Sequence, residues 1–223
     1  MIAPLFIELG TAIVGLALLA RLAGRWGFSA IPLYLLAGLA FGHGGLLPLG
    51  LSQEFIHVGA EIGVHEGDFS VEILRRVKPA ALHLIDPWRH EGGQEYQTAW
   101  YSVGQSTMDS RYESILRRFD KEIKRKRVQV HRAYSSVAVT SFPDDYFDWV
   151  YIDGNHLDEF VRKDLELYYP KVKSGGYLTG EDYGVEGWWK NGVQTAVDDF
   201  VRTRGLKFEL IETQFVFRKP RND

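Results

Sequence analysis

Residues 60–70 read Ala-Glu-Ile-Gly-Val-His-Glu-Gly-Asp-Phe-Ser, and this stretch decides the fold. Its apolar start predicts a buried β-strand over 60–64, and the turn after it leads into a helix predicted over 69–77. Gly63 and Gly67 bracket the turn, where a residue without a Cβ lets the backbone come close to a ligand. A strand, a glycine turn and a helix in this order are typical of nucleotide-binding α/β domains, although an ordinary strand-to-helix turn shares the pattern.

Downstream of this turn, short apolar runs alternate with amphipathic segments, which predicts a parallel sheet with helices on both faces. The further strands are predicted over 81–85, 128–131, 147–152, 176–179, 206–211 and 214–218, and the further helices over 108–126, 157–169 and 193–203. A short turn separates the last two strands, which predicts an antiparallel pair. The expected fold is therefore α/β, with a seven-stranded Rossmann-like sheet whose last strand is reversed.

An acid at the end of the second predicted strand strengthens the case for a nucleotide-like ligand. Asp86 comes 23 residues after Gly63. This is near the spacing at which an acid accepts hydrogen bonds from ribose hydroxyls, and the same acid disfavours a 2′-phosphate. The alternative is that Asp86 caps a helix or forms a turn before Pro87.

Three more acids are predicted at the carboxyl edge of the sheet. Asp153 ends the fourth strand, and Glu181 and Asp182 follow the fifth. Packed carboxylates repel one another unless a cation or a shared proton relieves them, and Mg²⁺ with oxygen ligands would do so. The alternative is that Asp153 contacts cofactor or substrate directly while Glu181 faces solvent. His156, three residues after Asp153, is the candidate general base with that acid, although it also suits a helix cap.

Four stretches, in the order expected of one family, carry a resemblance. They are residues 60–70, Leu-Ile-Asp-Pro-Trp at 84–88, Phe-Pro-Asp-Asp-Tyr-Phe-Asp-Trp-Val-Tyr-Ile-Asp-Gly-Asn-His at 142–156 and Lys-Ser-Gly-Gly-Tyr-Leu-Thr-Gly-Glu-Asp-Tyr at 173–183. Together they resemble class I S-adenosylmethionine-dependent methyltransferases, in the subgroup that includes macrolide-sugar O-methyltransferases.

The resemblance implies a cofactor and a set of site residues. S-adenosylmethionine would be bound by Glu61, Gly63, Gly67, Ser70 and Asp86, with Ser135 beside its adenine. The metal-dependent sugar O-methyltransferases carry acids similar to Asp153, Glu181 and Asp182, and the departure here is the longer glutamate at 181. The acceptor would be a small hydroxylated or sugar-like molecule, next to a glycine-rich loop that carries Trp188 and Trp189. The alternative for these tryptophans is packing under a surface loop.

The first 58 residues have a different composition. Residues 1–53 carry only Glu8, Arg21 and Arg25 as charged side chains, and two apolar runs over 2–20 and 28–51 are each long enough to cross a bilayer. They resemble the first two membrane helices of monovalent cation:proton antiporters, but two helices cannot form a transport pathway. We expect an apolar helical hairpin over 1–58, either membrane-associated or a fused fragment, before a methyltransferase domain over 59–223.

Composition narrows the alternatives. The net charge of −3 gives no basic face for nucleic acid, and the absence of cysteine excludes disulfides, thiolate metal sites and cysteine nucleophiles. A methyltransferase with its catalytic domain in the cytoplasm, anchored to a membrane if the hairpin inserts, is the leading hypothesis. The second hypothesis is a nicotinamide-dependent oxidoreductase, which would use the same turn and the same acid for the ribose. The third hypothesis is a membrane-associated, non-catalytic binding module. The oligomeric state stays open.

Overall fold

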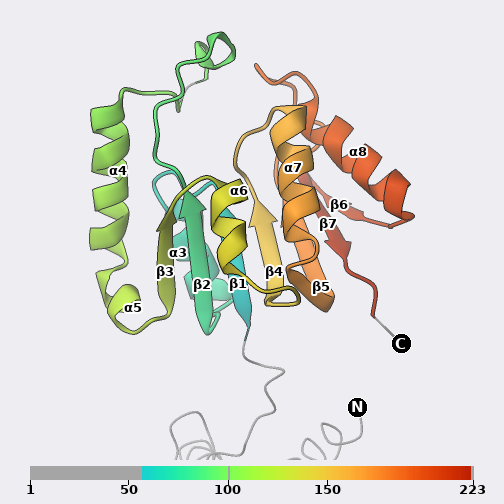
Figure 1. Ribbon diagram of the computed structural model, residues 1–223, viewed down its shortest axis with the longest axis horizontal. Helices are drawn as coiled ribbons and strands as arrows, with labels where there is room; N and C mark the ends of the chain where they lie inside the picture. Colours follow the sequence, from blue (N-terminus) through green and yellow to red (C-terminus); the bar gives the residue numbers. More distant parts are fainter. Residues whose placement is uncertain (1–56, 100, 222–223) are drawn as a thin grey trace, which may run out of the picture. The chain divides into compact units, whose positions relative to one another are not determined.

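The computed structural model describes residues 57–99 and 101–221 (Figure 1). The hairpin predicted over 1–58 lies outside the described residues, apart from its last two positions. Among the described helices, none combines the length and the apolar character that a bilayer crossing requires.

Seven strands form one sheet in the order β3-β2-β1-β4-β5-β7-β6. Their bounds are β1 Val58–Ile62, β2 Ala81–Asp86, β3 Val128–Arg132, β4 Phe147–Ile152, β5 Val172–Gly180, β6 Glu209–Ile211 and β7 Gln214–Arg218. Neighbouring strands are parallel except at β7, which is antiparallel to both β5 and β6. The predicted seven-stranded α/β sheet with a reversed last strand is confirmed, and the reversed strand lies between β5 and β6.

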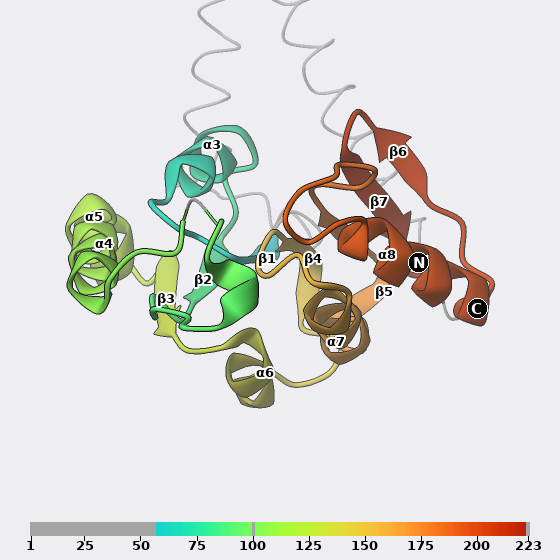
Figure 2. The ribbon, with the colours of Figure 1, turned by 90° about the horizontal axis from the view of Figure 1, so that it is seen from above.

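Helices cover both faces of the sheet (Figure 2). One side carries α3 Asp68–Arg76, α4 Gln105–Arg118 and α5 Asp120–Lys124, and the other carries α6 Ser135–Ala138, α7 Asp158–Tyr168 and α8 Gly192–Arg204. Two short 3-10 turns, η2 Gln94–Tyr96 and η3 Val139–Ser141, lie in the connections. This layered arrangement brings the carboxyl ends of β1, β2, β4 and β5 to one edge, where the loops of the site begin.

Two apolar cores flank the sheet because side chains along a strand alternate between its faces. On the α3 and α4 side, Leu82 and Leu84 pack with Ile115. On the α7 and α8 side, Val150 and Ile152 pack with further buried side chains of those helices. The alternation that predicted the strands thus also assigns each residue to its core.

The helix predicted over 108–126 is two helices, α4 and α5, and it begins three residues early at Gln105. The break falls at Phe119, whose backbone leaves the helical region with φ −107° and ψ 17°. Its ring stays buried against Ile115 and neighbouring residues of the core. Apolar spacing continues through the break, and so the pattern alone gave no sign of the turn.

Candidate active site

The loop after β1 depends on Gly63. Its φ of +88° lies in the left-handed region, and a Cβ there would come 1.9 Å from the carbonyl oxygen of Asp153. Gly67, with φ +77°, precedes α3, but a Cβ on it would meet the side chains of Ile115 and Phe119. Gly63 therefore brings the backbones after β1 and β4 together, whereas Gly67 allows α4 to pack close to the loop.

Asp86, at the end of β2, is bound by backbone groups. Its Oδ2 accepts hydrogen bonds of 3.0 Å from the N–H groups of Val64 and His65, and its Oδ1 accepts one of 2.7 Å from the N–H of Trp88. Burial raises the pKa of Asp86, while these three N–H groups act in the opposite direction. The carboxylate thus fixes the shape of the glycine loop at the place predicted for the ribose.

Glu61 and Ser70 form a buried pair beneath the same loop. The hydroxyl of Ser70 donates a hydrogen bond of 2.5 Å to Glu61 Oε2, and both side chains are almost fully buried. The pKa of Glu61 is raised to about 8: burial raises it most, the hydrogen bond from Ser70 lowers it, and the charges of Asp153 and Asp86 add to the rise. The carboxylates at the ends of β2 and β4 therefore both disfavour ionisation of Glu61.

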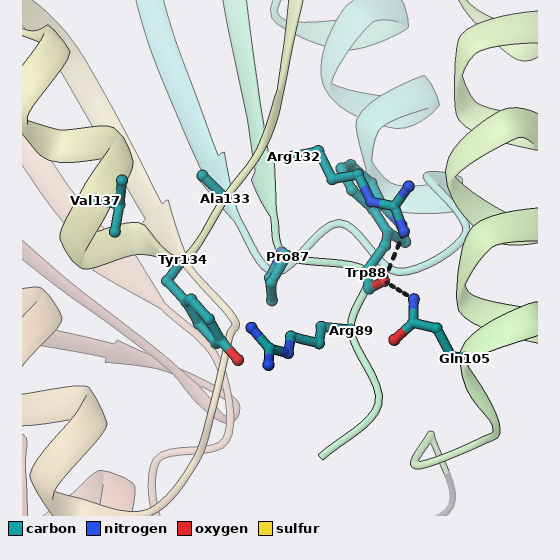
Figure 3. A pocket seen from close by; sticks show the side chains of 8 residues that line it. All are labelled: Pro87, Trp88, Arg89, Gln105, Arg132, Ala133, Tyr134 and Val137. Carbon is teal, nitrogen blue, oxygen red and sulfur yellow. Dashed lines mark hydrogen bonds between the residues drawn. The ribbon is translucent and has the colours of Figure 1, made fainter.

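A pocket of about 370 Å³ begins at Pro87, the residue after Asp86, and extends to the end of β3. Figure 3 shows the side chains that line it. It is lined by Pro87, Trp88, Arg89, Gln105, Arg132, Ala133, Tyr134 and Val137. Ser135, predicted to lie beside the adenine, directly follows this wall, but its hydroxyl donates to the buried carboxylate of Asp164. Backbone and neighbouring side chains, and not the Ser135 hydroxyl, therefore form the surface of this pocket.

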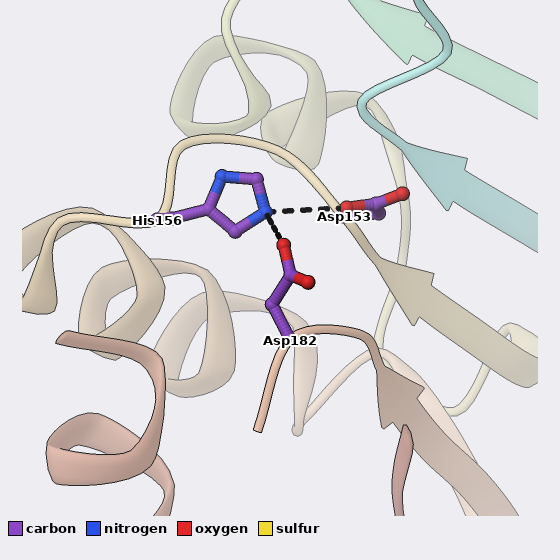
Figure 4. A group of neighbouring side chains, drawn as sticks. All are labelled: Asp153, His156 and Asp182. Atoms are coloured by element: carbon purple, nitrogen blue, oxygen red, sulfur yellow. Dashed lines mark ion pairs between the residues drawn. The ribbon is translucent and has the colours of Figure 1, made fainter. Parts of the chain in front are cut away.

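Asp153, His156 and Asp182 meet at the ends of β4 and β5 (Figure 4). The Nε2 of His156 lies 3.3 Å from Asp153 Oδ1 and 2.8 Å from Asp182 Oδ2. Burial lowers the pKa of His156, but the hydrogen bonds and charges of the two carboxylates outweigh it and raise it to about 9. Burial also raises the pKa of Asp153. The two carboxylates thus favour the protonated form of the imidazole.

Each of these three residues offers one donor atom within 4.8 Å of the other two, so the group could hold a metal ion. Glu181, the third acid predicted for a metal, points away from this group. Its carboxylate accepts hydrogen bonds from Tyr151, Thr213 and Gln214. The sequence placed Asp153, His156 and Asp182 correctly at one edge, but it did not separate the roles of the two adjacent acids.

An aromatic cover lies beside the acid and histidine group. The ring of Trp189 lies 4.7 Å from that of His156, and Trp188 contacts the rings of Tyr96 and Tyr101. Tyr96 also accepts a hydrogen bond of 2.7 Å from Asn155. The tryptophans were expected near the acceptor, whereas Tyr96 was missed because it lies in a segment without periodic pattern. The sequence offered one indication of this contact: Asn155, in the string Asp-Gly-Asn-His, is a polar residue between Asp153 and His156 that can donate a hydrogen bond.

Comparisons with known proteins identify a family and a shared fold. Residues 60–183 match the family described as a methyltransferase domain. Among solved structures, a protein from Corynebacterium glutamicum is 16% identical, with a TM-score of 0.55 over 94% of this chain and 91% of the other. The O-methyltransferase NovP is 20% identical, with a TM-score of 0.54 over 74% and 72%. An O-methyltransferase from Bacillus cereus in complex with SAH is 12% identical, with a TM-score of 0.52 over 75% and 76%. No curated protein matches the chain.

Proposed function

The chain belongs to the methyltransferase family that it matches and depends on S-adenosylmethionine, and on that premise we propose that it methylates a hydroxyl group of a small molecule. The acceptor that we propose is polyhydroxylated or sugar-like. The observation that carries the proposal is the group of Asp153, His156 and Asp182, which can accept a proton at the edge where the cofactor loop ends.

The acids around the glycine loop support a cationic cofactor. Burial raises the pKa of Glu61, Asp86 and Asp153, and the charges of Asp153 and Asp86 raise that of Glu61 as well. A sulfonium and an ammonium group relieve such repulsion, because a nearby positive charge favours the ionised carboxylate. A nicotinamide dinucleotide would bring two negative phosphates to the same place. Gly63, Asp86 and the pocket next to Ser135 are the proposed positions for the methionine, ribose and adenine parts, respectively.

The reaction needs alignment and one proton acceptor. The acceptor oxygen attacks the methyl carbon, the new O–C bond forms, and the S–C bond breaks with its electron pair left on sulfur. We assign the hydroxyl proton to Nε2 of His156, whose ring is oriented by Asp153 and Asp182. A neighbouring cation favours the neutral form of an imidazole, so His156 would lose its resting proton to water when the sulfonium is bound. Only then could its Nε2 accept the hydroxyl proton.

A divalent cation also suits the donors of this group. Asp153 and Asp182 offer carboxylate oxygens and His156 offers a nitrogen, all within reach of one ion. Mg²⁺ prefers oxygen ligands, so the two aspartates would hold it. Bound there, the ion would lower the pKa of the acceptor hydroxyl. His156 Nε2 lies between the two carboxylates, and a protonated imidazole and a metal ion are therefore competing occupants of the same place.

The aromatic cover supports a ring-shaped, oxygen-rich acceptor. Trp189 lies next to His156, and Trp188 packs against Trp189. Both indole N–H groups are buried with no hydrogen-bond partner among the described residues. A buried donor without a partner is costly. Hydroxyl oxygens of a sugar-like acceptor would accept from these groups while its ring packs on the indoles.

The direct test is a labelled-methyl transfer screen against hydroxylated metabolites, with Mg²⁺ and with a chelator. We expect transfer to an oxygen of at least one sugar-like compound. Calorimetry with S-adenosylmethionine and with NAD is the companion measurement. Binding of NAD in place of S-adenosylmethionine would overturn the assignment of the loop.

The place of action follows from the cofactor, which is a cytosolic metabolite. We propose that the catalytic domain lies in the cytoplasm and that residues 1–58 provide any membrane association. Flotation with lipid vesicles, using the full chain and a chain that begins at residue 59, tests this. Equal flotation of both chains would contradict a role for the hairpin.

A further inference from the structure

Glu181 lies next to the acid and histidine group, but its contacts belong to other parts of the sheet. Its Oε2 accepts a hydrogen bond of 2.6 Å from the Tyr151 hydroxyl and one of 2.8 Å from Nε2 of Gln214. Its Oε1 accepts a hydrogen bond from the Thr213 hydroxyl. The side chain therefore ties the end of β5 to β4 and to the start of β7.

The residue that follows has an unusual backbone. Asp182 has a φ of +63°, in the left-handed region that residues with a Cβ adopt only at some cost. Backbone hydrogen bonds hold the residues on both sides: Glu181 donates to the carbonyl of Ile152 at 3.2 Å, and Tyr183 donates to that of Thr213 at 2.9 Å. This turn directs the Asp182 carboxylate back to His156 Nε2, 2.8 Å away.

We propose that Glu181 is a positioning residue, which holds the turn at Asp182 so that the Asp182 carboxylate meets His156. The proposal rests on the methyl-transfer function assigned above and deepens it. It replaces the expectation that Glu181 ligates a metal. To reach the ion, its carboxylate would have to leave three donors, among them the hydroxyl of the buried Tyr151. A buried donor left without an acceptor is penalised, so the tethered position is favoured.

Three substitutions separate the two roles. Glu181→Gln keeps a carbonyl oxygen for Tyr151 and Gln214, and its amide can donate to the Thr213 oxygen, but it removes the negative charge. Glu181→Ala removes the tether. Thr213→Val removes one tethering hydrogen bond and leaves every carboxylate in place. If Glu181 positions Asp182, the glutamine variant should keep the His156 environment and the activity of the parent protein. If Glu181 is instead a metal ligand, the valine variant should keep them.

The readout is the pair of imidazole ¹⁵N resonances of His156 at fixed neutral pH, without added metal or acceptor. We expect them to move in Glu181→Ala and Thr213→Val and to stay in place in Glu181→Gln. The resonances of His83 and His131, in the middle of β2 and β3, serve as internal controls for a general loss of structure. With any acceptor found in the screen, methyl transfer should fall about 10- to 100-fold in the alanine variant and recover in the glutamine variant.

The outcomes are distinct. Unmoved His156 resonances in Thr213→Val, or a glutamine variant as altered as the alanine variant, overturn the positioning role. If Glu181→Ala does not fold, Thr213→Val still decides the question. A parent protein that transfers no methyl group to any acceptor refutes the proposed function, but leaves the resonance comparison intact.

Discussion

The two halves of the sheet edge are built by different means. On the cofactor half, the carboxylate of Asp86 accepts hydrogen bonds from backbone N–H groups, and Gly63 lets two loops touch. On the acceptor half, side chains hold side chains, as in the contacts of His156 with Asp153 and Asp182. Backbone donors do not depend on the identity of their residues. The shape of the cofactor half therefore depends mainly on the backbone and on few side chains, whereas the shape of the acceptor half depends on several side chains at once.

The largest effect that separates the two halves is expected when the Asp182 carboxylate is removed. Without its carboxylate, His156 loses its closer partner, and we expect methyl transfer to fall about 1,000-fold, the scale of general-base catalysis. The affinity for S-adenosylmethionine should stay within about threefold of the parent, because the cofactor half is untouched. Asp182→Ala is measured by single-turnover transfer and by calorimetry. An equal loss of cofactor binding would mean that the two halves are one unit.

Asp86→Ala should, in contrast, weaken the binding of the cofactor. Three backbone N–H groups lose their acceptor and the proposed ribose contact is gone, so we expect cofactor affinity to fall about 100-fold. Calorimetry with S-adenosylmethionine measures it. Asp120→Ala, on the exposed surface of α5, is the matched control and should bind as the parent does. Retained affinity in Asp86→Ala would assign this acid to the loop alone.

Gly63→Ala tests the contact between the halves. The new Cβ would overlap the Asp153 carbonyl and the positive φ adds strain, so we expect the free energy of unfolding to fall by about 3 kcal/mol. Chemical denaturation measures the change. Gly92→Ala is the control, since a Cβ there meets nothing within 4 Å. Similar stability for both variants would show that the loops can move apart without cost.

Mild acid should weaken the cofactor half through His83. Its Nδ1 lies 2.9 Å from Nε2 of His131, and burial, followed by the charge of His131, lowers the pKa of His83 to about 4. The unfolded chain takes up its proton near pH 6.5. Stability should therefore fall as the pH drops from about 6.5 to about 4, by about 3 kcal/mol in total. Denaturation series at several pH values measure this slope.

His83→Phe provides the comparison for the acid experiment. A neutral ring of similar size packs against the surrounding aromatic side chains, Phe142 and Phe147 among them. We expect a shallower loss of stability between the same pH values. An unchanged slope would attribute the acid sensitivity to other groups.

The positions of Gly63 and Asp86 could be predicted from the sequence, whereas the contacts of Glu181 could not, for a physical reason. The glycine loop and Asp86 are encoded within a short stretch, because one strand, one turn and the next strand fix their positions. The tether of Glu181 joins residues more than thirty positions apart in the chain, and no sequence pattern marks Thr213 or Gln214 as its partner. The break at Phe119 was missed because the apolar spacing continues through it.

The hairpin of β6 and β7 has a consequence for synthesis. Thr213 and Gln214 are translated after every acid of the reaction centre, yet they hold the neighbour of one of those acids in place. A ribosome-bound chain that lacks these residues would already contain the cofactor loop, but not an organised proton acceptor. If Glu181 positions Asp182 as proposed, activity would thus arise only after residues 213 and 214 have been synthesised.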